Sequence, residues 1–204
     1  MRLLSSSAAM VFCLLGQNIA HASECATPGD MKQGLRLVYG ADGTTKVKRR
    51  TDGLIEFTEI GSGADGGDLV YASRYGLYDL EAAAAGAGAG PDRRVTYDYD
   101  GGPLVEPAPG ATGWVGQVIA TFPGDAPVPE TAAFVFGGAV AVAVGDCSFD
   151  AVTVEATFIR ERDWEGQSFL YFPDFGFATL IGRAGPEMPK ERYELTAIEP
   201  LPAE

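Results

Sequence analysis

Histidine is almost absent from this chain of 204 residues, since His21 is the only one. It falls in an amino-terminal segment with the features of a secretory signal peptide, so we expect the mature protein to contain none. Ser-His-Asp and Cys-His catalytic systems and histidine-ligated metal sites are then excluded. No Ser-x-x-Lys, P-loop or dinucleotide-binding motif is present either. We therefore assign no catalytic residue, no metal ligand and no cofactor.

The signal peptide is predicted to cover residues 1–22. Met1-Arg2 gives a positive start, Leu3–Ile19 is uncharged and largely apolar, and Ala20-His21-Ala22 places small residues at the cleavage site. The alternative is a membrane anchor, but the apolar run is shorter than the roughly 20 residues needed and polar residues interrupt it. Cleavage leaves residues 23–204 as one domain. We expect it to be periplasmic or secreted and not to span a membrane.

Basic residues are scarce. The chain has 15 Lys and Arg against 28 Asp and Glu, a net charge of −13, and removal of Arg2 makes the mature protein still more acidic. Nucleic acid is therefore excluded as a partner, because phosphate contacts need clustered Lys and Arg. The one basic cluster, Lys46–Arg50, is assigned to the solvated face of a strand. The charge is compatible with a cationic partner.

Cysteine is also rare, with three in the whole sequence. Cys13 leaves with the signal peptide, so Cys25 and Cys147 remain as a pair. In an oxidising compartment such a pair forms a disulfide, which a chain-entropy model values at about 4–5 kcal/mol for so long a loop. The alternative, a reactive or metal-binding thiol pair, lacks both the C-x-x-C spacing and a histidine partner. We predict a structural disulfide.

Helix-like patterns are nearly missing, and the sequence predicts an all-β fold. Short alternating or apolar runs are separated by Gly, Pro and Asp-Gly turns throughout the mature chain. They predict about ten strands in a single antiparallel sheet domain, arranged as a sandwich or a half-barrel. Leu80–Ala85 is the one stretch of helix-like composition, and residues 82–91 are predicted to form a surface loop. The expected strands are 35–39, 45–50, 54–60, 68–80 (one strand, or two with a bend), 95–100, 114–122, 134–144, 152–158, 169–172, 177–183 and 193–198.

The run from Phe134 to Val144 is apolar on both of its alternating faces. Such a pattern is typical of a central strand covered on both sides. Its side chains are most simply plain core, although they are also candidates for the lining of a ligand cavity.

A turn near the carboxyl terminus carries a family resemblance. Tyr171-Phe172-Pro173-Asp174-Phe175-Gly176-Phe177, preceded by Gly145–Phe149 and the strand that follows it, resembles uncharacterised periplasmic all-β domains, a family of unknown function. The likeness covers residues 134–198. It implies a curved sheet or half-barrel whose concave side holds something apolar, and it carries over no functional residues.

Acidic residues are the remaining source of chemistry. Asp98 and Asp100 are expected on one face of a strand, where acid–base catalysis competes with the simpler interpretation of a solvated face. The loops 61–68 and 98–102 contain fragments similar to calcium-binding motifs, but each lacks the repeats or ligand spacing that such sites require. Hairpin loops are the simpler interpretation of both.

A tyrosine-rich segment is the candidate recognition surface. Tyr71, Arg74, Tyr75 and Tyr78 combine the residue types favoured at interfaces. The alternative is ordinary sheet packing, because aromatic residues are preferred in strands.

The function expected from these observations is a non-enzymatic binding or interaction module. Its partner would be an apolar small molecule or an envelope protein. Two alternatives stay open: a hydrolase that uses paired carboxylates, for example on a glycan, and a purely structural envelope component. A deep apolar cavity would favour binding, whereas facing carboxylates in a cleft, one with a raised pKa, would favour hydrolysis.

Overall fold

The computed structural model of this protein describes residues 25–63, 66–86, 93–161 and 163–202. The predicted signal peptide, residues 1–22, lies outside the described residues, as do residues 87–91 of the predicted loop 82–91. No helix within the described ranges is long and apolar enough to cross a membrane.

The described chain forms one continuous antiparallel sheet, which confirms the all-β prediction, although its 13 strands exceed the expected number of about ten. Strands β1 to β12 follow one another in the sheet in sequence order. Strand β13 returns to pair with the edge of β1 that β2 does not occupy. Residues 68–80 are two strands joined by a turn. The elements are the short 3-10 helix η1 (Pro28–Lys32) and β1 (Leu35–Val38), β2 (Thr44–Arg49), β3 (Ile55–Glu59), β4 (Leu69–Arg74), β5 (Tyr78–Ala84), β6 (Val95–Asp100), β7 (Trp114–Thr121), β8 (Val128–Val144), β9 (Cys147–Ile159), β10 (Trp164–Phe172), β11 (Phe177–Ala184), β12 (Glu191–Arg192) and β13 (Ala197–Pro200).

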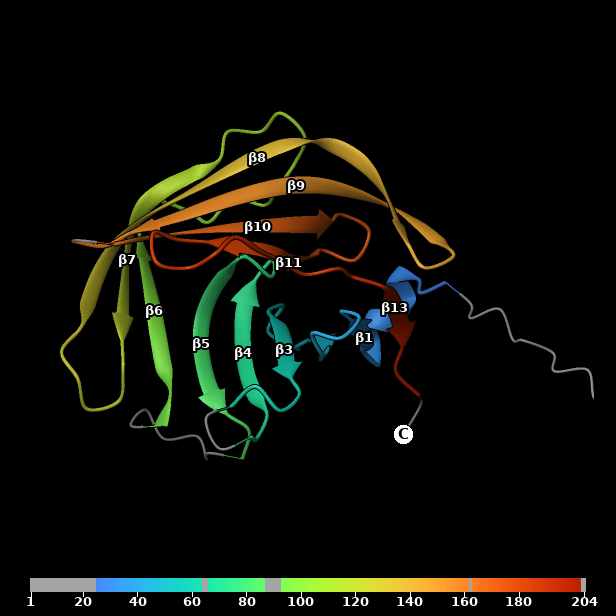
Figure 1. Ribbon diagram of the computed structural model, residues 1–204, viewed down its shortest axis with the longest axis horizontal. Helices are drawn as coiled ribbons and strands as arrows, with labels where there is room; N and C mark the ends of the chain where they lie inside the picture. Colours follow the sequence, from blue (N-terminus) through green and yellow to red (C-terminus); the bar gives the residue numbers. More distant parts are fainter. Residues whose placement is uncertain (1–24, 64–65, 87–92, 162, 203–204) are drawn as a thin grey trace, which may run out of the picture.

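The sheet curls over itself, so that the long strands β8–β11 lie across the shorter strands β3–β6 (Figure 1). The β4–β5 turn touches the opposite layer directly, since the Ala178 amide of β11 donates a 2.7 Å hydrogen bond to the Tyr75 carbonyl. Gly76 follows with φ of +69°, and a Cβ there would stand 2.4 Å from the Ala178 carbonyl oxygen. Only glycine permits this approach of two backbones.

Alternating side chains explain which face of each strand turns inward. In β2, Thr45 and Val47 are buried whereas Lys46 and Lys48 are exposed. The predicted Asp-Gly hairpin is present, because Tyr39 donates to the Gly43 carbonyl at 3.0 Å and Gly43 adopts φ of +123°. The basic cluster therefore lies mainly on the solvated side of a strand, as its alternation predicts.

Two hydrophobic clusters fill the inside of the curl. One gathers Leu35, Ile55 and Phe177, and the other is centred on Tyr78 and Phe134. Burial of apolar area in these clusters is the main source of stability.

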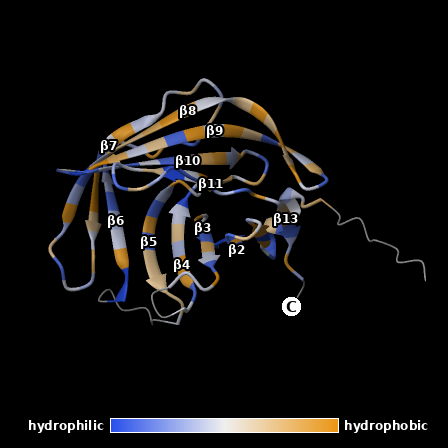
Figure 2. Cartoon of the chain, in the orientation of Figure 1, coloured by the Kyte–Doolittle hydropathy of each residue, from blue (hydrophilic) through white to orange (hydrophobic). Residues whose placement is uncertain are grey.

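Two expectations about individual strands are wrong. Residues 134–144, predicted to be covered on both sides, form part of β8 with Phe134 buried but Val135 62% and Val140 38% exposed. No described element covers the outer side of β8, whose mixed hydropathy is visible in Figure 2. Residues 82–84, predicted as the start of the surface loop 82–91, instead lie in β5 with most of the helix-like stretch Leu80–Ala85, because pairing with β4 outweighs the local composition.

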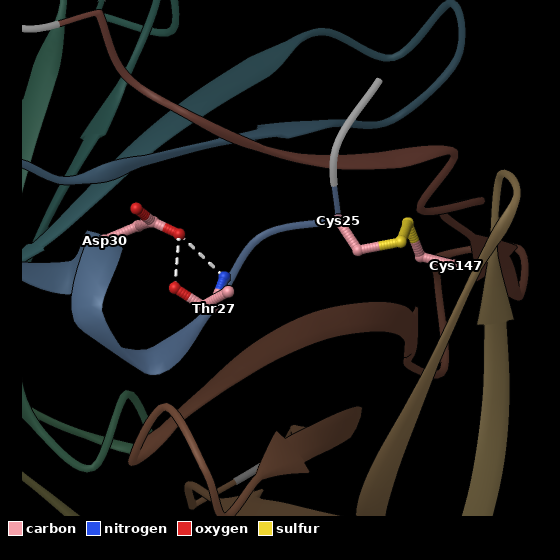
Figure 3. Close-up of a disulfide and its surroundings, with 4 residues drawn as sticks. All are labelled: Cys25, Thr27, Asp30 and Cys147. Carbon is pink, nitrogen blue, oxygen red and sulfur yellow. Dashed lines mark hydrogen bonds between the residues drawn. A yellow bond between two sulfur atoms is a disulfide. The ribbon is translucent and has the colours of Figure 1, made fainter. Parts of the chain in front are cut away.

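The predicted disulfide joins Cys25 to Cys147, with the two Cα atoms 5.8 Å apart (Figure 3). It attaches the chain before η1 to the first residue of β9, at the β8–β9 hairpin. Beside it, the Asp30 carboxylate accepts two 2.7 Å hydrogen bonds, from the backbone amide and the hydroxyl of Thr27, at the start of η1. The disulfide attaches the amino-terminal segment to the sheet, and the Thr27–Asp30 hydrogen bonds stabilise the start of η1 itself.

Candidate functional site

A cleft of about 530 Å³ lies inside the curl of the sheet. Its lining comes mainly from β3–β6 and from β9–β11, with further residues from the β1–β2 hairpin, β7 and β8. Aromatic and aliphatic side chains make up part of the lining, including Phe57, Phe158, Phe169 and Leu180. Polar side chains form two groups within the lining, and the two groups differ in how their charges are compensated.

Two carboxylates form the first polar group, which we name the acidic end: Glu59 at the end of β3 and Asp79 in β5. Glu59 accepts a 3.0 Å hydrogen bond from the hydroxyl of Tyr71. Among the described residues, no hydrogen bond or ion pair reaches the Asp79 carboxyl, and no Arg or Lys pairs with Glu59. The acidic end therefore holds two carboxylates without a basic partner.

A β-bulge positions Asp79. The pairing of β4 with β5 shifts between Ala72 and Ser73, so that Ser73 faces Asp79 while Ala72 faces Glu81. Leu80 is the extra residue of β5. Tyr78 and Asp79 are consecutive, yet Tyr78 is fully buried in the core and Asp79 lines the cleft. A regular strand would place such neighbours on opposite faces.

The surroundings of Asp79 change its acidity. Burial, together with the nearby charge of Glu59, raises the pKa of Asp79 to about 7. Burial disfavours the ionised form, and a second carboxylate opposes it further. Asp79 is thus poised to change its protonation state near neutral pH.

Tyrosines surround the acidic end. Tyr97 and Tyr99 of β6 line the cleft, and the pKa of each is raised by burial first and by the charge of Asp79 second. Burial likewise raises the pKa of Tyr71, with the charges of Glu59 and Asp79 adding to it. These rings are therefore close enough to Asp79 to sense its charge.

A further tyrosine bridges the two layers beside this group. The hydroxyls of Tyr39 and Thr179 form a hydrogen bond from the end of β1 to β11. Burial raises the pKa of Tyr39 to about 12, so it remains a neutral hydrogen-bonding group. The contact ties the layers together at one side of the cleft.

The second polar group, which we name the paired end, holds carboxylates that have arginine partners. Arg160 Nε lies 2.9 Å from Glu130, and Arg183 donates two hydrogen bonds of 2.9 and 2.7 Å to Glu165. Although burial raises the pKa of Glu165, hydrogen bonds from Gln167 and Arg183 outweigh it and hold that pKa below its usual value. Charge at this end is compensated within the protein.

The structure distributes the tyrosine-rich candidate surface over several environments. Tyr71 lines the cleft, whereas Arg74 is exposed at the end of β4. Tyr75 occupies the following turn with φ of +60°, and Tyr78 is fully buried with its hydroxyl donating to the Val105 carbonyl at 3.0 Å. The four residues are not brought together on one exposed face, because the turn at 75–77 interrupts the strand.

The other sequence candidates lie outside the cleft lining. Asp98 and Asp100 are exposed on the face of β6 opposite Tyr97 and Tyr99. In the loop from Gly61 to Asp68, described except for residues 64 and 65, the Asp68 carboxylate accepts a 3.0 Å hydrogen bond from the Gly61 amide. Over the described ranges, no group of three or more His, Cys, Asp or Glu side chains is arranged to hold a metal ion.

Sequence reasoning missed the residues of the acidic end. Glu59 shares the alternation of Ile55 and Phe57, which predicted its inward face, but an acidic residue at a strand end was not singled out. Asp79 gave no such indication, because a bulge changes its face.

No protein-family model, no curated protein and no solved structure matches this chain.

Proposed function

We propose that the protein is an extracytoplasmic binding protein that holds a small organic molecule in the cleft and does not transform it. The observation that carries the proposal is the cleft itself, with apolar, aromatic and polar side chains in its lining. Ligand pockets in proteins have volumes of about 300–1,000 Å³ and the same mixture of walls and polar groups. The polar ends favour a ligand with a polar or charged group over a wholly apolar one.

Two features support a location outside the cytosol. Disulfides persist in oxidising compartments, and Cys25–Cys147 is compatible with such a compartment. The sequence of residues 1–22 has the composition of a cleavable signal peptide.

Filling the cleft tests the proposal. Leu180 lines the cleft and is partly buried, so Leu180→Trp is designed to occupy the space that a ligand would use. Val135→Trp, on the exposed face of β8, is the matched control. A library of small amines, acids, sugars and aromatic alcohols is screened by native mass spectrometry and saturation-transfer NMR.

The expected result is that compounds bind the wild type and the Val135→Trp variant but not the Leu180→Trp variant. Binding that survives in Leu180→Trp, or a library with no bound member, contradicts the proposal. Circular dichroism and thermal melting establish that both variants are folded.

A second candidate function is hydrolysis by a carboxylate pair, and the raised pKa of Asp79 beside Glu59 favours it. A protonated Asp79 would act as general acid, with Glu59 as base or nucleophile, as in glycosidases. The test is turnover of a panel of nitrophenyl glycosides by wild type and Asp79→Asn. Turnover by the wild type that the variant loses would replace the binding proposal; we expect no turnover by either.

A further inference from the structure

Resting on the proposed binding function, we infer that the ligand is an organic cation, an ammonium with an apolar body, whose charged group lies at the acidic end beside Asp79 and Glu59. The inference starts from a carboxyl without a protein partner. Asp79 is partly buried, lines the cleft and receives no hydrogen bond from the described residues. Polar groups withdrawn from bulk water are normally hydrogen-bonded, so this carboxyl is available to accept a hydrogen bond from a ligand.

The charge of Glu59 makes the ionised form of Asp79 still less favourable. Glu59 contributes a second negative charge, and its one hydrogen bond comes from the neutral hydroxyl of Tyr71. Two carboxylates that line one cleft repel each other, and each also loses part of its hydration. A cation placed between them removes both penalties, which a neutral or anionic ligand does not.

The tyrosines supply a suitable environment for such a group. Tyr71, Tyr97 and Tyr99 are close enough to Asp79 for its charge to raise their pKa values. Aromatic rings attract ammonium groups through their negative faces, and recognition of organic ammonium ligands commonly uses several rings. The same rings provide apolar area for the carbon atoms next to the charge.

The rest of the cleft lining indicates the chemistry of the remainder of the ligand. Phe158, Phe169 and Leu180 present an apolar surface in the cleft. At the paired end, Arg160 and Arg183 are already bound to Glu130 and Glu165, so they are not free to select an anionic ligand. The net charge of −13 also attracts cations to the protein at long range. An ammonium with an apolar body fits these features together.

Three probes of similar size but different charge test the inference: 2-phenylethylammonium, 2-phenylethanol and phenylacetate. Their affinities for the wild type are measured by calorimetry at pH 8 and low salt. We expect the ammonium to bind at least tenfold more tightly than the alcohol, and phenylacetate to bind most weakly. Asp79→Asn should weaken the ammonium at least tenfold and leave the alcohol within twofold.

Asp98→Asn is the matched control, because it removes an equal charge from the exposed face of β6. It should leave the ammonium affinity within twofold. Equal loss in both variants would mean attraction by overall charge and would overturn the inference. If the alcohol binds as well as the ammonium and Leu180→Trp abolishes both, the cleft binds ligands but the inference is wrong. If no probe binds, the inference fails for this class, and the library screen decides the binding function separately.

Discussion

The two polar groups of the cleft lining, the acidic end and the paired end, hold the same kind of side chain in opposite circumstances. At the paired end, Glu130 and Glu165 each have an arginine within 3 Å, so their charges are compensated when the protein folds. At the acidic end, Asp79 and Glu59 have no such partner among the described residues, and the pKa of Asp79 is raised to about 7. The paired end is arranged to stabilise the sheet, whereas the acidic end carries a cost that a bound cation would offset.

The largest expected effect on stability comes from removing the disulfide. This change also tests whether the difference between the two ends depends only on the residues that line the cleft. Replacing both Cys25 and Cys147 with serine should lower the free energy of unfolding by about 2–4 kcal/mol, because the unfolded chain loses a constraint across a separation of 122 residues. Urea denaturation measures the loss. The disulfide lies outside the cleft lining, so the relative affinities of the three probes should stay as in the wild type. A changed order of affinities would show that the disulfide shapes the acidic end.

Removing the charge of Asp79 should stabilise the protein at high pH. Between pH 3.8 and about 7 the unfolded carboxyl has released its proton while the folded one retains it, so this group makes stability fall as pH rises. The shift sets an upper bound of about 4 kcal/mol. Because water reaches the cleft, we expect Asp79→Asn to gain about 1–3 kcal/mol above pH 7 and almost nothing near pH 4.

Denaturation of wild type and Asp79→Asn at several pH values measures this difference. The subtraction removes contributions from other groups in the cleft. Those groups are Tyr39, Asp42, Glu59, Tyr71, Tyr97, Tyr99, Glu130, Arg160, Glu165, Arg183 and Tyr193. An equal gain at pH 4 and pH 8 would contradict the role given to the Asp79 charge.

At the paired end, removing one charged group should lower the stability of the protein instead of raising it. Arg160→Met keeps an apolar stem of similar length and leaves Glu130, 8% exposed, without its cation. We expect a loss of about 1–3 kcal/mol, less than for a fully buried pair because Arg160 is itself half exposed. Arg74→Met, at an exposed arginine of β4, should change stability by less than about 0.5 kcal/mol. Equal losses in the two variants would remove the distinction between the ends.

The smallest effect concerns the one hydrogen bond that Glu59 receives. Tyr71→Phe removes the donor while keeping the ring that stacks on Phe57 at 5.1 Å. A stability loss of about 0.5–1.5 kcal/mol is expected from chemical denaturation. Tyr193→Phe, which removes a hydrogen bond to the exposed Glu191, should have a smaller effect. A Tyr71→Phe variant as stable as the wild type would show that Glu59 is satisfied by water.

Much of the sheet was predictable because strand alternation and turn chemistry are local. The Asp42-Gly43 hairpin and the inward side of Tyr97 and Tyr99 follow from patterns a few residues long. The covered strand at 134–144 and the start of the predicted loop at residue 82 were wrong, because local composition does not reveal which segments lie beside a strand or over it. Of the acidic end, only the face of Glu59 was accessible to sequence reasoning.

By itself, the sequence determined the fold class, the absence of histidine chemistry from residues 23–204 and the pairing of Cys25 with Cys147. These depend on residue types, on short-range patterns and, for the cysteines, on elimination. The tertiary structure alone decided that Asp79 and Glu59 both line one cleft, where the charge of Glu59 contributes to raising the pKa of Asp79. A one-residue bulge selects the face of Asp79, and the curl of the sheet closes β9–β11 over it. Both depend on contacts between residues far apart in the chain, for which alternation gives no indication.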